Sequence, residues 1–244
     1  MKIFTAILFV WGSLSLSLKA QETSQVNQQL WLEGMVDNSF GVKWDLWADG
    51  SYRQLYSDGT NNWRATIRPN IKYQVLEWLD FRIGLMGMYS YFDESNASLE
   101  VRPSEGFAIG WPKIIGIKFV HLVRFEQRFI YDTSDWTYDF SGRIRYQLST
   151  RINLSRTKKY KTFFIPLAAE MFLQSKNEVN DLFRNRARFT VGLGYVFNRE
   201  ITVDAKFMVE QNRSDAMELN ITDTIFRLRF RYNLFSFEED ETKL

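Results

Sequence analysis

A two-residue alternation of apolar and polar side chains runs through almost the whole chain and decides which folds it can adopt. Between His121 and Phe129, for example, Arg124, Glu126 and Arg128 share one parity, and apolar side chains such as Phe125 share the other. Successive side chains of a strand point to opposite faces, whereas a helix would scatter these charges around its circumference. The segment is therefore predicted to be a β-strand with one apolar face and one charged face.

The same pattern recurs along the sequence, and it is clearest at residues 63–75, where it has no exception. Strands are predicted at 29–36, 42–53, 63–75, 81–91, 99–109, 119–131, 138–148, 162–174, 184–197, 201–210 and 220–235. Single-chain bacterial barrels normally have an even number of strands, which implies that one strand was split or missed in this count of eleven. We expect about twelve strands, or ten if 29–36 or 99–109 does not span.

Two all-β folds have one apolar and one charged sheet face: a secreted soluble sandwich and an outer-membrane barrel. The predicted strands have roughly 10 to 15 residues, at or above the 9 to 11 or so that cross a bilayer and longer than the usual 5 to 6 of soluble sheets. Arginines recur on the polar face, and on a lipid face each would cost about 2 to 4 kcal/mol at the midplane. Aromatic residues cluster near the predicted strand ends, as in interfacial girdles. We therefore expect a transmembrane antiparallel up-and-down β-barrel over residues 21–235, with the sandwich as the alternative.

Composition excludes several classes of function. The chain has no cysteine, so it has neither a disulfide framework nor a thiolate metal site, and its single histidine, His121, leaves no histidine cluster for a metal. Lysine and arginine (31) nearly balance aspartate and glutamate (29), and a net charge of +2 does not favour nucleic acid as a partner. We expect no cofactor and no metal.

The two ends of the chain differ from the alternating region. Residues 1–20 combine Lys2 with an apolar run from Ile3 to Leu18, which predicts a secretory signal peptide cleaved near Ala20 and Gln21. An amino-terminal membrane anchor is the alternative. Residues 236–244 are predicted to be an acidic carboxyl-terminal tail. With the alternating strands, the signal peptide predicts localisation in the outer membrane.

Connection lengths predict an orientation for the barrel. The connections at 76–80 and 198–200 are the shortest and are expected to face the periplasm, where the carboxyl terminus would also lie. The opposite, outer end would then hold the loops around Ser57, Glu94, Ser134, Asn177 and Ser214.

Several segments of the sequence resemble one family. These are the hairpin 124–129 with 143–146, the strand with Trp44 and Arg53, the strand from Arg68 and Pro69 to Tyr73, Glu100 to Arg102, and Gly192 to Tyr195. Together they resemble an uncharacterised family of Bacteroidota outer-membrane proteins known as domain of unknown function 2490. The resemblance covers most of the chain after the signal peptide. It implies an outer-membrane β-barrel and no established activity.

The polar faces of the predicted strands would together form a charged lumen. The side chains assigned to this network are Arg64, Arg68, Glu100, Arg102, Arg124, Glu126, Arg128, Arg143, Arg145, Glu170, Arg186, Arg188, Asp204, Glu210, Arg227 and Arg229. Some of its carboxylates would lie close enough together to work as an acid and a base. A carboxylate beside arginine stays ionised, however, so structural ion pairs are the favoured interpretation, first of all for Glu126.

Three functions remain compatible with such a barrel. The favoured one is a structural or narrow-pore transport barrel, since an arginine-rich lumen lowers the entry barrier for small anionic solutes. Another is a lipid hydrolase of the phospholipase or lipid A deacylase type, for which His121 is the only available base; its parity puts it on the lipid-facing side. The last is an accessory subunit bound to a partner outer-membrane protein. We expect no catalytic residues, and outer-membrane lipid as a constant partner.

Overall fold

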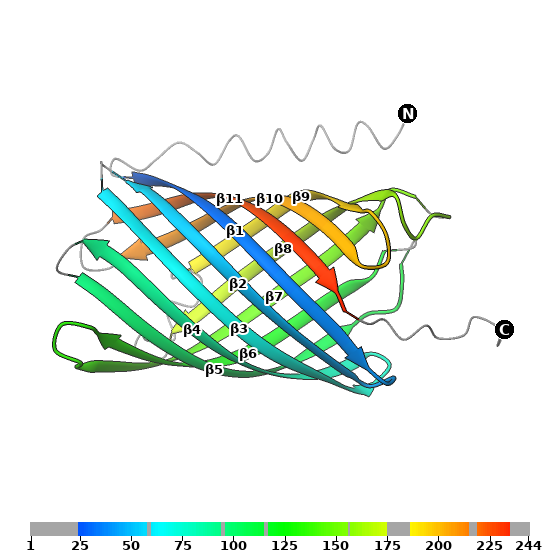
Figure 1. Ribbon diagram of the computed structural model, residues 1–244, viewed down its shortest axis with the longest axis horizontal. Coiled ribbons are helices and arrows are strands. Elements are labelled where there is room, and N and C mark those ends of the chain that lie inside the picture. Colours follow the sequence, from blue (N-terminus) through cyan, green and yellow to red (C-terminus); the bar gives the residue numbers. More distant parts are fainter. Residues whose placement is uncertain are drawn as a thin grey trace.

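A computed structural model describes residues 24–57, 60–93, 96–114, 117–155, 157–174, 186–214 and 219–234. The predicted signal peptide and the predicted acidic tail lie outside these residues. In the described part, eleven strands form one closed barrel (Figure 1). The strands are β1 (Ser24–Phe40), β2 (Trp44–Ser57), β3 (Thr60–Leu76), β4 (Leu79–Asp93), β5 (Asn96–Gly110), β6 (Phe119–Asp132), β7 (Tyr138–Asn153), β8 (Thr162–Gln174), β9 (Arg186–Val196), β10 (Ile201–Ser214) and β11 (Leu219–Asn233). No helix among the described residues is long and apolar enough to cross a membrane.

The prediction of an all-β barrel is confirmed, but the predicted strand number of twelve, or ten, is wrong. Consecutive strands pair antiparallel, whereas β1 and β11 pair in parallel, from Ser24 beside Asn220 to Asp37 beside Asn233. In Figure 1 the arrows of β1 and β11 lie side by side and point the same way. An even number is required only if every pair is antiparallel. One parallel pair closes the barrel with eleven strands, so within the described residues no strand was split or missed.

The connections fall into two sets at the two ends of the barrel. The Trp78 end holds the described connections 41–43, 77–78 and 197–200, and the Asp135 end holds the described connection 133–137. The two shortest connections predicted from sequence are at the Trp78 end. Of the five predicted outer loops, the one around Ser134 is at the Asp135 end, where the strand ends at Ser57 and Ser214 also lie, whereas Glu94 and Asn177 lie outside the described residues. Which side of a membrane each end faces stays a prediction.

The outer wall of the barrel is apolar and carries aromatic side chains toward both ends. At the Asp135 end Trp63 stacks on Tyr91, with ring centroids 5.9 Å apart. At the Trp78 end Trp44 packs on Tyr73 at 4.6 Å. Between them lie exposed aliphatic and phenylalanine side chains such as Ile67. Because β-branched and aromatic side chains suit a pleated surface, the residues that form the strands also form this wall.

The opposite faces of the strands fill the lumen with polar groups. Glu100, Glu126 and Glu210 are among the most buried side chains of the described residues, each about 1 to 2 % exposed. A small apolar cluster of Trp31, Met208 and Ile225 accompanies them. The alternation of the sequence therefore separates an apolar outer wall from a charged interior.

Candidate functional site

A network of ion pairs crosses the lumen wall from β5 to β10. It begins at Glu100, which accepts hydrogen bonds from Arg102 Nε at 2.7 Å and from Arg128 Nε at 2.8 Å. Arg102 also reaches Glu126 on the next strand at 3.4 Å. Charge-assisted hydrogen bonds of this kind are the strong ones, because guanidinium and carboxylate geometries match. Glu100 thus joins β5 to β6, and Arg102 extends the network to a second carboxylate, Glu126.

Glu126 is the centre of the network. It accepts a hydrogen bond from Arg143 Nε at 2.8 Å, and three further guanidinium groups approach it: Arg102 at 3.4 Å, Arg124 at 3.8 Å and Arg145 at 3.9 Å. The carboxylate is almost fully buried. Four cations around one anion leave this part of the lumen with a local excess of positive charge.

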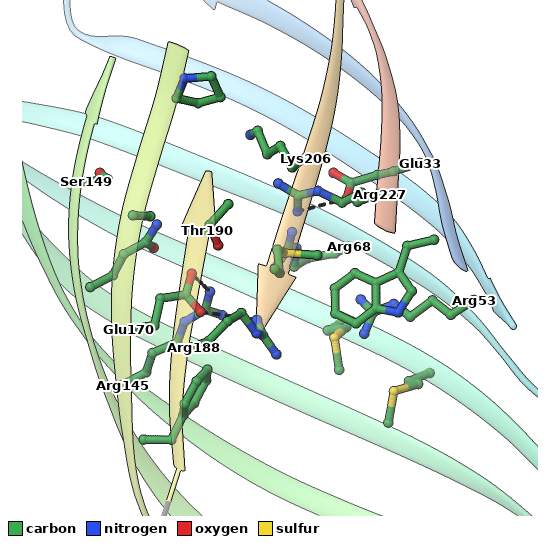
Figure 2. Close-up of a pocket in the computed structure, with 18 of the residues that line it drawn as sticks. Glu33, Arg53, Arg68, Arg145, Ser149, Glu170, Arg188, Thr190, Lys206 and Arg227 are labelled. Atoms are coloured by element: carbon green, nitrogen blue, oxygen red, sulfur yellow. Dashed lines mark hydrogen bonds and ion pairs between the residues drawn. The ribbon is translucent and has the colours of Figure 1, made fainter. Parts of the chain in front are cut away.

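The network then continues to β10 through two more carboxylates. Arg145 donates to Glu170 at 2.8 Å, and Arg188 donates to the other oxygen of Glu170 at 3.1 Å. Arg188 also donates from Nε to Glu210 at 2.7 Å. Figure 2 shows Glu170 between Arg145 and Arg188. The alternating acids and bases tie neighbouring strands together on the inside of the barrel.

A second set of ion pairs lies around Glu33 on β1. Arg227 and Arg229 from β11 approach its carboxylate at 3.3 Å and 2.7 Å. Asp204 and Lys206 on β10 form a separate pair at 3.2 Å. Because β1 and β11 are the parallel pair, the contacts of Glu33 link the first strand to the last from inside the lumen.

Four of five adjacent strands present a cation in one row across the sheet. Lys206 on β10 lies opposite Arg227 on β11, Arg227 lies beside Trp31 on β1, and Trp31 is followed by Arg53 on β2 and Arg64 on β3. We call the four cations of this row the cationic row. Like charges directly opposite in a sheet are destabilising. Repulsion within the row therefore favours an anion in the lumen beside it.

Arg53 and Arg64 of the cationic row line two cavities of about 340 and 500 Å³. Both volumes are in the range of small-molecule sites. The smaller cavity is lined by ten cationic side chains: Arg53, Arg64, Arg68, Arg102, Arg128, Arg143, Arg145, Arg188, Lys206 and Arg227. Only two carboxylates, Glu33 and Glu170, line it among the described residues. A solute in this cavity meets a strongly positive surface.

The structure brings most of the residues assigned to the lumen from sequence into these pairs and cavities. Arg68 pairs with Asp49 at 3.0 Å. Arg186 lies in β9, but its side chain is outside the described part of the structure. The sequence assignment omitted Glu33, Arg53 and Asp49. The last two share the polar parity of β2 and could have been found from it, whereas the segment with Glu33 does not alternate strictly.

Residues 28–221 match the model of a family described as protein of unknown function (DUF2490). The chain belongs to this family. No curated protein matches the sequence.

The one histidine of this DUF2490 barrel lies on the outer wall near the Trp78 end. His121 Nδ1 and the Tyr146 hydroxyl are 2.7 Å apart, and the imidazole packs against Trp111 with ring centroids 5.6 Å apart. No serine hydroxyl hydrogen-bonds to His121 among the described residues. Within the same residues, no group of three or more His, Asp and Glu side chains is arranged to hold a metal ion. The local arrangement is an aromatic cluster at the barrel rim.

Glu105 is an exception to the separation of charge and apolar surface in this DUF2490 barrel. Among the strand residues whose side chains are described, it is the only charged one on the outer wall, where it is exposed. Its cross-strand neighbours are Ile83 and Phe125, both exposed apolar side chains. Glu100 and Arg102 of this strand were assigned to the lumen from the sequence, whereas Glu105 was not singled out, although its parity assigns it outward.

Proposed function

We propose that this protein is an outer-membrane β-barrel whose lumen takes up small anionic solutes. The observation that carries the proposal is the lining of the smaller cavity, with ten cations against two carboxylates. Positive charge concentrated in a confined, low-dielectric space raises the local concentration of anions and lowers their entry barrier. The ion pairs around Glu126 and Glu170 hold the arginines in place, and the excess cations act on the solute.

Three features support a membrane location. The strands have 11 to 17 residues, enough to cross a bilayer at a tilt. The outer wall is apolar between its two groups of aromatic residues, as lipid-facing barrel walls are. Arginine or lysine on such a wall would cost about 2 to 4 kcal/mol at the midplane, and the described strands direct these residues inward.

Barrel size indicates a narrow path for the solute. Barrels of about 8 strands are filled by side chains, and open aqueous channels occur near 16 strands. Eleven strands with a lumen full of arginine and glutamate fall between these limits, with cavities of hundreds of Å³ in place of a wide channel. The proposed activity is therefore binding and slow passage of single small anions.

Reversal potentials test this proposal. The purified barrel is inserted into planar bilayers under a tenfold potassium chloride gradient, and we expect a potential whose sign shows chloride to be more permeant than potassium. Arg53→Gln with Arg64→Gln should lower the selectivity. Arg231→Gln is the matched control, because Arg231 pairs with Asp37 at 2.8 Å and does not line either cavity. A cation-selective barrel, or one with no conductance, would refute the proposed passage of anions.

A role beside another membrane protein is a second candidate, and Glu105 favours it. A carboxylate on a lipid-facing wall is costly unless a cation covers it, and charged groups at such positions commonly mark functional sites. A photo-crosslinker placed at position 105 would test this role. We expect one defined crosslinked product in native membranes, and crosslinks to lipid alone would contradict the role.

A further inference from the structure

The larger cavity differs from the rest of the lumen in having an apolar side. The apolar side of this cavity is lined by three inward-pointing side chains, Leu55 on β2, Phe92 on β4 and Ile130 on β6. Phe92 keeps 37 % of its surface exposed, although it lies inside a barrel whose inner face is mainly charged. Exposed aromatic surface in a cavity is unfavourable in water and becomes favourable when an apolar group covers it. The lining therefore suits a ligand with an apolar part.

Arg53 marks the point where this apolar side meets the cationic row. Its guanidinium lies 4.0 Å from the centroid of the Trp31 ring, and its Nε donates to Ser51 Oγ at 3.2 Å. Among the described residues, no carboxylate forms an ion pair with Arg53, whereas Arg145, Arg188 and other guanidinium groups of the lumen have one. In Figure 2, Arg53 lies across the cavity from Arg145. Arg53 is thus a cation held in place by an aromatic ring and a hydroxyl group.

The two cavities share this position. Both cavities are lined by Trp31, Arg53, Arg64 and Met88. An anion bound at Arg53 therefore contacts the smaller, cationic cavity and the larger, partly apolar cavity. Arg64 links the two surfaces directly, because its guanidinium lies 5.3 Å from the ring centroid of Phe92. A guanidinium offers paired N–H donors that match a carboxylate or a phosphate.

From this arrangement we propose that the lumen has a binding site for an amphipathic organic anion. The carboxylate or phosphate group binds Arg53 and Arg64, and the apolar part lies along Leu55, Phe92 and Ile130. The inference rests on the proposed anion-accepting lumen and adds the class of solute. A fully polar anion would leave the apolar side of the larger cavity uncovered, and a neutral apolar solute would leave Arg53 without a counter-charge.

Calorimetric titration of the folded barrel in amphipol tests the site with three probes that separate the two features. 4-Phenylbutyrate has both a carboxylate and an apolar part, acetate has only the carboxylate, and 4-phenylbutanol has only the apolar part. We expect 4-phenylbutyrate to bind at least tenfold more tightly than either of the others. Inorganic phosphate serves as a fourth probe of charge alone and should also bind at least tenfold more weakly.

Two variants assign the features to residues. Arg53→Gln should weaken 4-phenylbutyrate at least tenfold, and Phe92→Ser should weaken 4-phenylbutyrate but not acetate. Arg231→Gln, at the Trp78 end, should change neither, and circular dichroism checks that each variant is folded. Equal binding of acetate and 4-phenylbutyrate, or an unchanged affinity in Arg53→Gln, would overturn the inference. That result would leave chloride selectivity in bilayers intact, whereas loss of chloride selectivity in the wild type would refute the proposed function itself.

Discussion

Replacing Glu126 by glutamine tests whether the lumen network holds the barrel together. The substitution keeps the shape of the side chain and removes the one negative charge that Arg102, Arg124, Arg143 and Arg145 share. Two unit charges 4 Å apart interact by about 4 kcal/mol at an effective dielectric constant of 20, before the cost of desolvation is subtracted. Removing one partner of a buried pair typically costs about 3 to 5 kcal/mol, because a buried charge remains uncompensated. We expect Glu126→Gln to lower the free energy of unfolding by that amount.

The assay is reversible urea unfolding of the barrel in lipid vesicles, followed by tryptophan fluorescence. Asp37→Asn is the matched control, because Asp37 and its partner Arg231 are partly exposed at the Trp78 end. Exposed pairs contribute about 0 to 1 kcal/mol, so this variant should stay within that range of the wild type. Adding Arg143→Met to Glu126→Gln should recover part of the loss by removing one uncompensated cation. A loss in Glu126→Gln no larger than in Asp37→Asn would show that solvent already screens these charges, and the reasoning would fail.

Three further predictions concern other parts of the barrel. Glu105→Leu should raise the free energy of unfolding in a bilayer by up to about 2 kcal/mol, because a carboxylate leaves a wall that we propose to face lipid; a free energy of urea unfolding below that of the wild type would contradict this. His121→Ala should not change the phospholipase or lipid A deacylase activity measured for the purified barrel in a lipid-release assay. Loss of such an activity in this variant would show that the barrel is an enzyme. Gly106→Ala should cost about 1 to 3 kcal/mol, since a Cβ there would lie 2.3 Å from the carbonyl oxygen of Val123, whereas Gly34→Ala meets nothing within 4 Å and should cost less in the same assay.

Local alternation was sufficient to predict the barrel wall. At residues 63–75 the outward and inward side chains can be read directly from the sequence, and the structure gives that segment as most of β3. The first strand was harder, because Trp31 and Met35 share the inward face with Glu33 and hide the alternation. Parallel closure has no local sequence signal at all. It depends on the relative direction of two strands at opposite ends of the chain.

The same limit applies to the site. Parity showed which charges face the lumen, but the partner of each charge depends on the register between strands, as with Glu33 and Arg227, which are 194 residues apart. The apolar residues Leu55, Phe92 and Ile130 interrupt the polar parity of their strands, and only the closed barrel brings them to one cavity. The apolar side of the larger cavity therefore lies at departures from the alternation, which parity alone does not predict.

The parallel pairing of β1 and β11 also determines where the chain enters and leaves the barrel. In a barrel with an even number of strands, both events occur at one rim. Here the chain enters β1 at the Asp135 end with Ser24 and leaves β11 at the Trp78 end with Asn233. If the barrel spans a membrane, the first residue of β1 and the last residue of β11 lie at opposite surfaces of it. The strand order then presents one end to each side of the membrane, independent of any solute that passes through the lumen.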